Sequence, residues 1–165
     1  MTQMFQEPVE ACSRLLAARK KTIAFAESAT AGALMAAFAL TEDSGTILKG
    51  GIVCYDMAIK TDLLGVPRGL IDIYSAESIP VTKAITNGLK ALIDADCYIG
   101  VTGLIKPGGS ESAEKPVGTI FTCLLIEGDY LENKAVFQGD EIEVMDQVAE
   151  HICMLIIEKL SDQRL

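Results

Sequence analysis

Apolar residues recur at helical spacing in three stretches of the chain, at residues 3–19, 77–93 and 141–160. Positions three and four apart share one face of a helix, so each stretch predicts an amphipathic helix. A fourth helix is predicted from residue 29 to about residue 40, where alanine and glycine would allow close packing on a sheet. The predicted buried faces consist of Phe5, Val9, Cys12 and Leu16, then Ile79, Val81, Ile85, Leu89 and Leu92, and finally Met145, Val148, Ile152 and Leu155.

Five short apolar runs, several of them flanked by glycine or acidic residues, predict β-strands. The first three alternate with helices, as parallel strands do, whereas the last two follow each other across the turn Glu127-Gly128-Asp129 and predict an antiparallel pair. We therefore expect one α/β domain over residues 1–165, a three-layer α/β/α sandwich with a mixed, mainly parallel sheet. The predicted strands are residues 23–28, 50–55, 97–101, 118–126 and 134–138.

Three connecting segments are also assigned from the pattern. Residues 41–45 (TEDSG) predict a turn, residues 58–64 a short helix, and residues 102–116, with three glycines and two prolines, a long loop. No internal repeat, low-complexity tract or linker between domains is visible in the sequence.

Charge and composition narrow the classes of partner. The 165 residues carry 23 acidic against 14 basic side chains, a net charge of −9, which argues against a nucleic-acid partner because phosphate neutralisation needs a basic surface. No apolar run reaches the length of a membrane helix, and from the composition of the first residues we expect no signal peptide. The five cysteines lack any paired or metal-ligand spacing. We expect a cytoplasmic protein with reduced thiols and without metal or cofactor.

The residues that could take part in catalysis occur where the first two predicted strands end. Ser28 follows the first strand directly, Tyr55 ends the second, and Lys60 comes five residues later. The chain has one histidine, His151, so a serine nucleophile with a lysine base and a tyrosine relay is the one nucleophile arrangement it offers. Each residue also has an ordinary structural interpretation: Ser28 as a helix cap, Lys60 as an exposed lysine, and Tyr55 as a half-buried amphipathic side chain.

Two further segments would border the same end of the sheet. The loop at residues 101–110 could wrap a phosphate with its backbone amides, with Lys106 adding charge, although such loops often occur without ligands. Glu27 could bind a ligand hydroxyl or amide, or could act as a charge at the start of a helix. Amides at that helix start, or the amide of Gly103, could stabilise an oxyanion.

Several sequence motifs together resemble a known family. Residues 26–32 read AESATAG, and residues 49–55 read KGGIVCY with Lys60 following. The first is similar to the AESCTGG signature of the CinA C-terminal domain family, the nicotinamide mononucleotide deamidases. Further matches occur in the same order, so the resemblance spans about residues 5–160: Leu64-Gly65-Val66, Ser78, Ala95-Asp96, Val101-Thr102-Gly103, Pro107-Gly108-Gly109, Lys115-Pro116-Val117-Gly118-Thr119 and Phe137-Gln138-Gly139-Asp140.

The resemblance implies a self-associating three-layer α/β domain, a homodimer or larger homo-oligomer, that takes part in NAD recycling. Active members hydrolyse the carboxamide of nicotinamide mononucleotide to nicotinate mononucleotide and ammonia. Residue by residue, it implies Ser28 as the nucleophile, Lys60 as the base and Tyr55 as the assisting group. The expected substrate-binding residues are Glu27, Thr30, Gly32, Ser44, Thr102, Gly103 and Lys106.

The chain also departs from the family pattern. The TGIAGP loop is TGLIKP at residues 102–107, with Lys106 in place of a glycine, and a GSS motif is DSG at residues 43–45. Two arginines of a GDRxxVR motif are replaced by Glu141 and Met145. The alternatives left open are a family member that binds nucleotides without turnover or has a structural role, and an amidase with another substrate in which Lys106 substitutes for a lost arginine.

Overall fold

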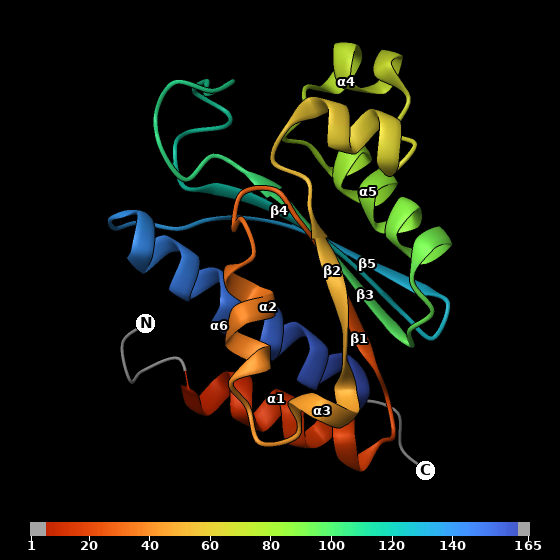
Figure 1. Cartoon of the computed structure of the whole chain (residues 1–165). Helices are drawn as coiled ribbons and strands as arrows, with labels where there is room; N and C mark the ends of the chain where they lie inside the picture. Colours follow the sequence, from red (N-terminus) through yellow and green to blue (C-terminus); the bar gives the residue numbers. More distant parts are fainter. Residues whose placement is uncertain (1–5, 162–165) are drawn as a thin grey trace.

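The computed structural model describes residues 6–161 and shows a central sheet with helices on both faces (Figure 1). The elements in chain order are α1 (Gln6–Ala18), β1 (Ile23–Glu27), α2 (Ala33–Ala39), α3 (Ser44–Ile47), β2 (Leu48–Val53), the π-helix η2 (Ile59–Leu63), α4 (Arg68–Tyr74), α5 (Ile79–Leu92), β3 (Cys97–Gly103), β4 (Thr119–Ile126), β5 (Asp129–Val136) and α6 (Glu141–Ser161).

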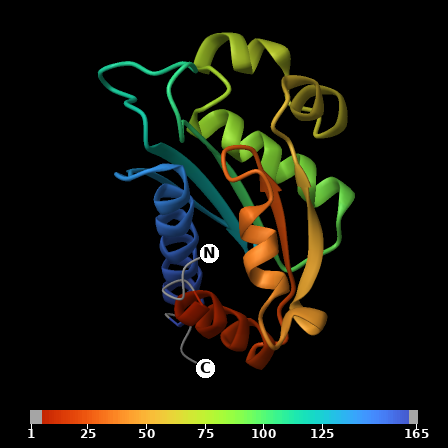
Figure 2. The same cartoon turned by 60° about the vertical axis from the view of Figure 1, so that its left-hand side comes forward.

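The five strands lie in the order β2-β1-β3-β4-β5. β1 is parallel to both β2 and β3, whereas β4 is antiparallel to both β3 and β5, so four of the five strands run in one direction. Helices α1, α2 and α6 lie on one face of the sheet and α5 on the other, with α4 at its outer end (Figures 1 and 2). The predicted three-layer sandwich with a mixed, mainly parallel sheet is confirmed.

The core is divided by the sheet into two layers of different side-chain size. Alternate residues of a strand point to opposite faces, and β1, β3 and β4 are covered on both, which explains their uninterrupted apolar runs. On the α6 side Phe25 packs against Phe38 of α2 with 5.1 Å between ring centroids. On the α5 side β1 presents only Ala24 and Ala26, so that helix lies close to the sheet.

Two glycines allow the close approach of α5. A Cβ atom on Gly100 of β3 would lie 2.1 Å from Thr86 Oγ1, and one on Gly88 of α5 would lie 2.1 Å from the Leu64 carbonyl oxygen. Neither position has room for a side chain. At Gly88 the obstacle is the backbone of Leu64, which cannot rotate away. The close contact fixes α5, and therefore the connection before it, against the carboxyl end of β3.

Element boundaries differ from the prediction where pairing or exposure overrides the apolar pattern. β2 was predicted at residues 50–55 but ends at Val53, because the parallel ladder stops opposite Glu27. β5 begins at Asp129 instead of residue 134 and pairs along all of β4. Its polar sequence, DYLENKAV, belongs to a sheet edge, where one face and one backbone side meet solvent.

The helices show similar differences. α4 was not predicted, because a seven-residue helix with one buried side chain, Ile71, shows no period. The segment at residues 41–45 leads into the short α3 rather than forming only a turn. Val9, Cys12 and Leu16 of the first predicted face are buried, and Phe5 lies outside the described residues. In α6 the buried row includes Val144, Val148, Ile152 and Ile156, with Met145 and Leu155 only partly covered; Leu92 of α5 is exposed.

Candidate active site

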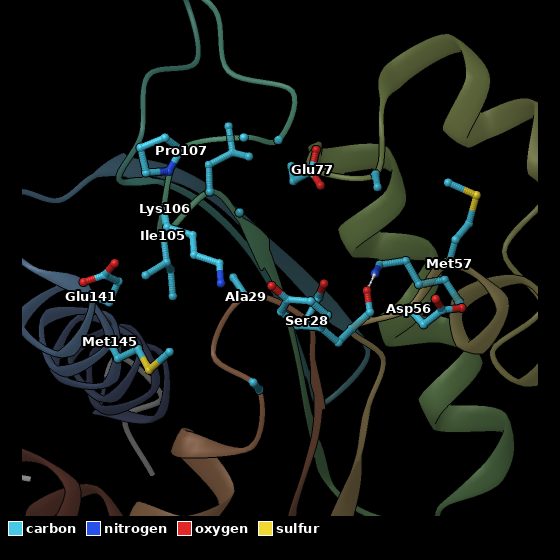
Figure 3. A pocket seen from close by; sticks show the side chains of 18 residues that line it. Ser28, Ala29, Asp56, Met57, Glu77, Ile105, Lys106, Pro107, Glu141 and Met145 are labelled. Carbon is cyan, nitrogen blue, oxygen red and sulfur yellow. Dashed lines mark hydrogen bonds between the residues drawn. The ribbon is translucent and has the colours of Figure 1, made fainter.

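A cavity of about 690 Å³ lies at the carboxyl ends of the three parallel strands. The chain leaves β1 toward β2 but leaves β3 toward β4, so the end of the sheet between them is the switch point at which α/β sheets bind ligands. In Figure 3 Ser28 lies between a wall formed by Lys106, Glu141 and Met145 and a wall formed by Asp56 and Met57. The cavity is lined by Ser28, Ala29, Ala31, Tyr55, Asp56, Met57, Lys60, Ala76, Glu77, residues 103–109, Glu141 and Met145.

Ser28 is the first residue after β1, and it does not cap α2. Its N–H donates to the Val101 carbonyl at 2.9 Å, which continues the pairing of β1 with β3, while its half-buried side chain lines the cavity. The N-cap of α2 is Gly32, four residues further on. Within residues 6–161 the Ser28 hydroxyl has no hydrogen-bond partner, so it is available to a ligand.

The Glu27 side chain holds the turn between β1 and α2 through hydrogen bonds. Its carboxylate is 1% exposed and accepts four hydrogen bonds, from the Thr30 hydroxyl at 2.7 Å and from the amides of Gly32, Leu34 and Met35 at 2.8–3.1 Å. Negative charge at a helix start is favourable, because the first amides have no partner inside the helix. Glu27, Thr30 and Gly32 were expected to bind substrate; the structure engages all three in this turn and places none of them in the cavity lining.

Two amides of the same turn remain available. The N–H groups of Ala29 and Thr30 have no acceptor within the described part of the chain, although both residues are buried. They directly follow Ser28, and Ala29 lines the cavity. The sequence pointed to amides at the start of α2 as oxyanion donors; those of Gly32, Leu34 and Met35 are occupied by Glu27, which leaves the pair after Ser28.

The turn carries strain at Ala31, whose φ of +49° lies in the left-handed region. We expect Ala31→Gly to stabilise the fold by up to about 1 kcal/mol, because glycine adopts this conformation without the Cβ penalty of an L-residue. The matched control, Ala36→Gly, should cost about 1 kcal/mol because Ala36 lies in the interior of α2. Urea unfolding of both variants measures the difference, and equal effects would contradict the assignment of strain to Ala31.

Lys60 is a buried lysine, not an exposed one. Its side chain is 3% exposed, and Nζ donates to the carbonyl oxygens of Cys54 at 2.5 Å and Tyr55 at 3.0 Å. Burial lowers the pKa of Lys60, and the nearby Cys54, Glu77 and Asp56 oppose that shift without cancelling it. The π-helix η2, which begins one residue before Lys60, turns the side chain back toward the end of β2. A neutral amine satisfies both carbonyls with its two N–H bonds and keeps a lone pair.

Tyr55 lies two residues beyond β2 and borders the cavity. Its side chain is 61% exposed and has no hydrogen-bond partner within residues 6–161. Its contact with Lys60 is made by the backbone carbonyl, so the main chain of Tyr55 holds the amine irrespective of the phenol.

The end of β3 and the loop after it contribute to the wall that contains Lys106. Gly103, Lys106, Gly108 and Gly109 all line it. Thr102, by contrast, is fully buried and its hydroxyl pairs with that of Thr82 at 2.8 Å, beneath the cavity rather than in it.

The remaining predicted site residue, Ser44, is separated from the cavity. It begins α3, immediately before β2, and therefore lies at the amino end of the sheet while Ser28 lies at the carboxyl end (Figure 1). Asp56, Met57 and Glu77 line the cavity but were not singled out from the sequence. Asp56 and Met57 lie between Tyr55 and Lys60 in the chain, so their place in the cavity lining could have been predicted from the sequence.

The loop is fastened across the cavity to the segment before α5. Lys115 Nζ donates to the hydroxyls of Ser75 at 2.7 Å and Ser110 at 2.6 Å, and the Ser110 hydroxyl donates to Glu77. Ser75 has φ +66°, outside helical geometry, where α4 ends.

In the described part of the chain no group of three or more His, Cys, Asp or Glu side chains could hold a metal ion. None of the helices there has the length and hydropathy required to cross a bilayer.

Two kinds of comparison with known sequences agree. The sequence profile of the CinA C-terminal domain matches residues 6–160. A CinA-like protein of Synechococcus sp. (strain CC9902) is 43% identical over 115 residues, 70% of this chain and 27% of that protein. A CinA-like protein of Mycolicibacterium gilvum (strain PYR-GCK) is 40% identical over 142 residues, 84% of this chain and 33% of that protein. The chain thus spans 27–33% of the length of these curated relatives.

Solved structures show the same arrangement. The competence damage-inducible protein A (ComA) of Klebsiella pneumoniae superposes with a TM-score of 0.90 at 28% identity, over 97% of this chain and 99% of that one. A competence-damaged protein (CinA) superfamily protein of the same species gives a TM-score of 0.90 at 27% identity, over 96% and 98%. By its profile, its relatives and its fold, the chain belongs to the CinA C-terminal domain family.

Proposed function

We propose that this protein is an amidohydrolase of the nicotinamide mononucleotide deamidase type, which converts nicotinamide mononucleotide and water to nicotinate mononucleotide and ammonia. The observation that carries the proposal is Lys60, a buried lysine whose pKa is lowered. Lys60 lines the same cavity as Ser28, whose hydroxyl has no hydrogen-bond partner within residues 6–161. A lysine is costly to bury, and a neutral amine next to a serine hydroxyl is the requirement of a serine–lysine nucleophile.

In the proposed mechanism Lys60 Nζ accepts the proton of the Ser28 hydroxyl as Oγ attacks the carboxamide carbon. The negative charge that develops on the carboxamide oxygen is stabilised by the free amides of Ala29 and Thr30. Lys60 then returns the proton to the departing nitrogen, and ammonia leaves an ester on Ser28. Water, deprotonated by Lys60, attacks the ester; the bond to Oγ breaks, the carboxylate product leaves and Ser28 recovers its proton.

A hydrogen bond between the Ser28 hydroxyl and Lys60 Nζ is expected to form when substrate is bound, because catalytic hydrogen bonds are often long or absent without a ligand. Lys60 is held for this step by the carbonyls of Cys54 and Tyr55, so its free lone pair has one remaining direction. The phenol of Tyr55 borders the cavity and is the candidate for relaying the proton toward the leaving group.

A second candidate is a protein that binds a nucleotide without turnover. It is favoured by Glu141 and Met145, which line the cavity where the resembling sequences carry arginines. The loss of a charge-assisted contact costs on the order of 1.5–3 kcal/mol, or roughly ten- to a hundredfold in affinity.

The test is ammonia release from nicotinamide mononucleotide by the purified protein, with Ser28→Ala as the matched blank. We expect release by the wild type and none above the uncatalysed rate by the variant, because alanine has no nucleophile. Titration calorimetry with the mononucleotide and with dinucleotides accompanies the assay. Binding without ammonia release would support the non-catalytic candidate, and release that is equal in both proteins would exclude Ser28 as the nucleophile.

A further inference from the structure

The charged residues of the cavity differ in whether the protein already uses them. Lys60 donates to two carbonyls, Asp56 accepts from the Ala58 amide, and Glu77 accepts from Ser110. Lys106 and Glu141 have no hydrogen bond or ion pair to any residue in the range 6–161, and both are exposed. Of the cavity's two lysines, Lys106 is therefore the one whose charge is not committed to the protein.

The position of Lys106 directs that charge toward a ligand. The side chain extends from the loop after β3 into the cavity rather than away from it (Figure 3). A free ammonium in this position gives up no protein partner when an anion arrives, so the new charge-assisted hydrogen bond replaces only contacts with water. The flexible stem of lysine also lets the charge follow the ligand.

The other anion-binding groups of this loop are less available. The Gly108 amide, one of those expected to wrap a phosphate, already donates to Glu111 Oε1 at 2.9 Å. The amides of Gly108, Glu111 and Gly109 together lower the pKa of Glu111, which keeps that carboxylate charged beside them. The part of the same wall that lies on α6 offers Glu141 and Met145 and thus no cation.

We infer that Lys106 is the residue that selects a substrate with a phosphate, by pairing with that phosphate while the carboxamide lies against Ser28. Glu141 opposes the same anion and sets an upper limit to its affinity. This inference rests on the proposed function for the identity of the substrate, and it assigns the phosphate to the loop after β3 rather than to α6. It predicts discrimination between nicotinamide mononucleotide and nicotinamide riboside, which differ only in that group.

The experiment measures binding of both compounds to the Ser28→Ala protein, in which turnover cannot distort the titration. Adding Lys106→Met should weaken binding of the mononucleotide about tenfold or more and leave that of the riboside within about twofold. The control is Lys90→Met, which makes the same change in net charge at an exposed position of α5. It should change neither affinity. Glu141→Lys, combined with Lys106→Met, should restore binding of the mononucleotide.

The outcomes separate this inference from the proposed function. If the wild type releases no ammonia from the mononucleotide, the proposed function fails, while the two titrations still test Lys106. If ammonia is released but Lys106→Met leaves mononucleotide binding unchanged, or weakens both ligands equally, Lys106 does not select the phosphate. Inorganic phosphate is the third ligand; binding as tight as that of the mononucleotide would show a site for free anions and overturn the inference.

Discussion

Lys60→Arg is expected to lower hydrolysis of nicotinamide mononucleotide by about a thousandfold or more while leaving the fold intact, because a guanidinium keeps its proton at every working pH. Arginine keeps a long apolar stem and N–H donors for the carbonyls of Cys54 and Tyr55, but it stays charged where the reactive lysine is neutral. The variant therefore removes the ability of the side chain to accept a proton. Ammonia release, measured together with the circular dichroism spectrum, reports both properties.

The pH dependence of the wild type has a definite sign. Burial lowers the pKa of Lys60 from its ordinary value of 10.5, so the neutral amine forms at lower pH than in an exposed lysine. The amine is the reactive form; activity must rise as the pH increases through this pKa and level off above it. A rate that falls with rising pH over the same range would contradict the role of Lys60 as base, as would substantial activity of Lys60→Arg at neutral pH.

A second large effect is expected at Glu27. Glu27→Gln should destabilise the protein by about 3 kcal/mol or more, because a neutral amide offers one acceptor oxygen to donors that two carboxylate oxygens now satisfy. The remaining amide nitrogen would face N–H groups, and those donors would have little access to water because the Glu27 side chain is 1% exposed. Urea unfolding followed by circular dichroism measures the change.

The control for Glu27 is Glu132→Gln, which makes the same chemical change at an exposed ion pair on β5. Glu132 lies 2.7 Å from Lys83, and exposed pairs of this kind contribute about 0–1 kcal/mol. We expect the control to unfold close to the wild type. A Glu27→Gln protein that unfolds within about 1 kcal/mol of the wild type would show that the four hydrogen bonds are not what holds the turn.

The sequence predicted the layers of the fold because β1, β3 and β4 are buried on both faces, and such strands show as apolar runs. It missed the first half of β5, whose stability comes from pairing with β4 and not from its own side chains. It also missed α4, which buries one side chain, Ile71. Pairing across a sheet edge and the docking of a helix of about two turns leave no periodic signal in a sequence.

The candidate site residues that lie at the ends of strands are the ones the structure brings together. Ser28, Tyr55 and Lys60 do border one cavity, as expected from the ends of their strands. The direction of a side chain was not predictable in the same way: Glu27 and Thr30 turn inward to the start of α2. Ser44 was placed by motif alone, and the strand order puts it at the other end of the sheet.

The burial of Glu27 beneath the nucleophile turn has a consequence for genetic experiments. A selection that scores only growth or product formation will rank substitutions at Glu27 beside those at Ser28 and Lys60, since an unfolded protein and an inactive one give the same colony. The two groups separate when the abundance of each variant is measured in parallel. Variants of Ser28 should persist at normal levels, whereas variants of Glu27 should be depleted by proteolysis.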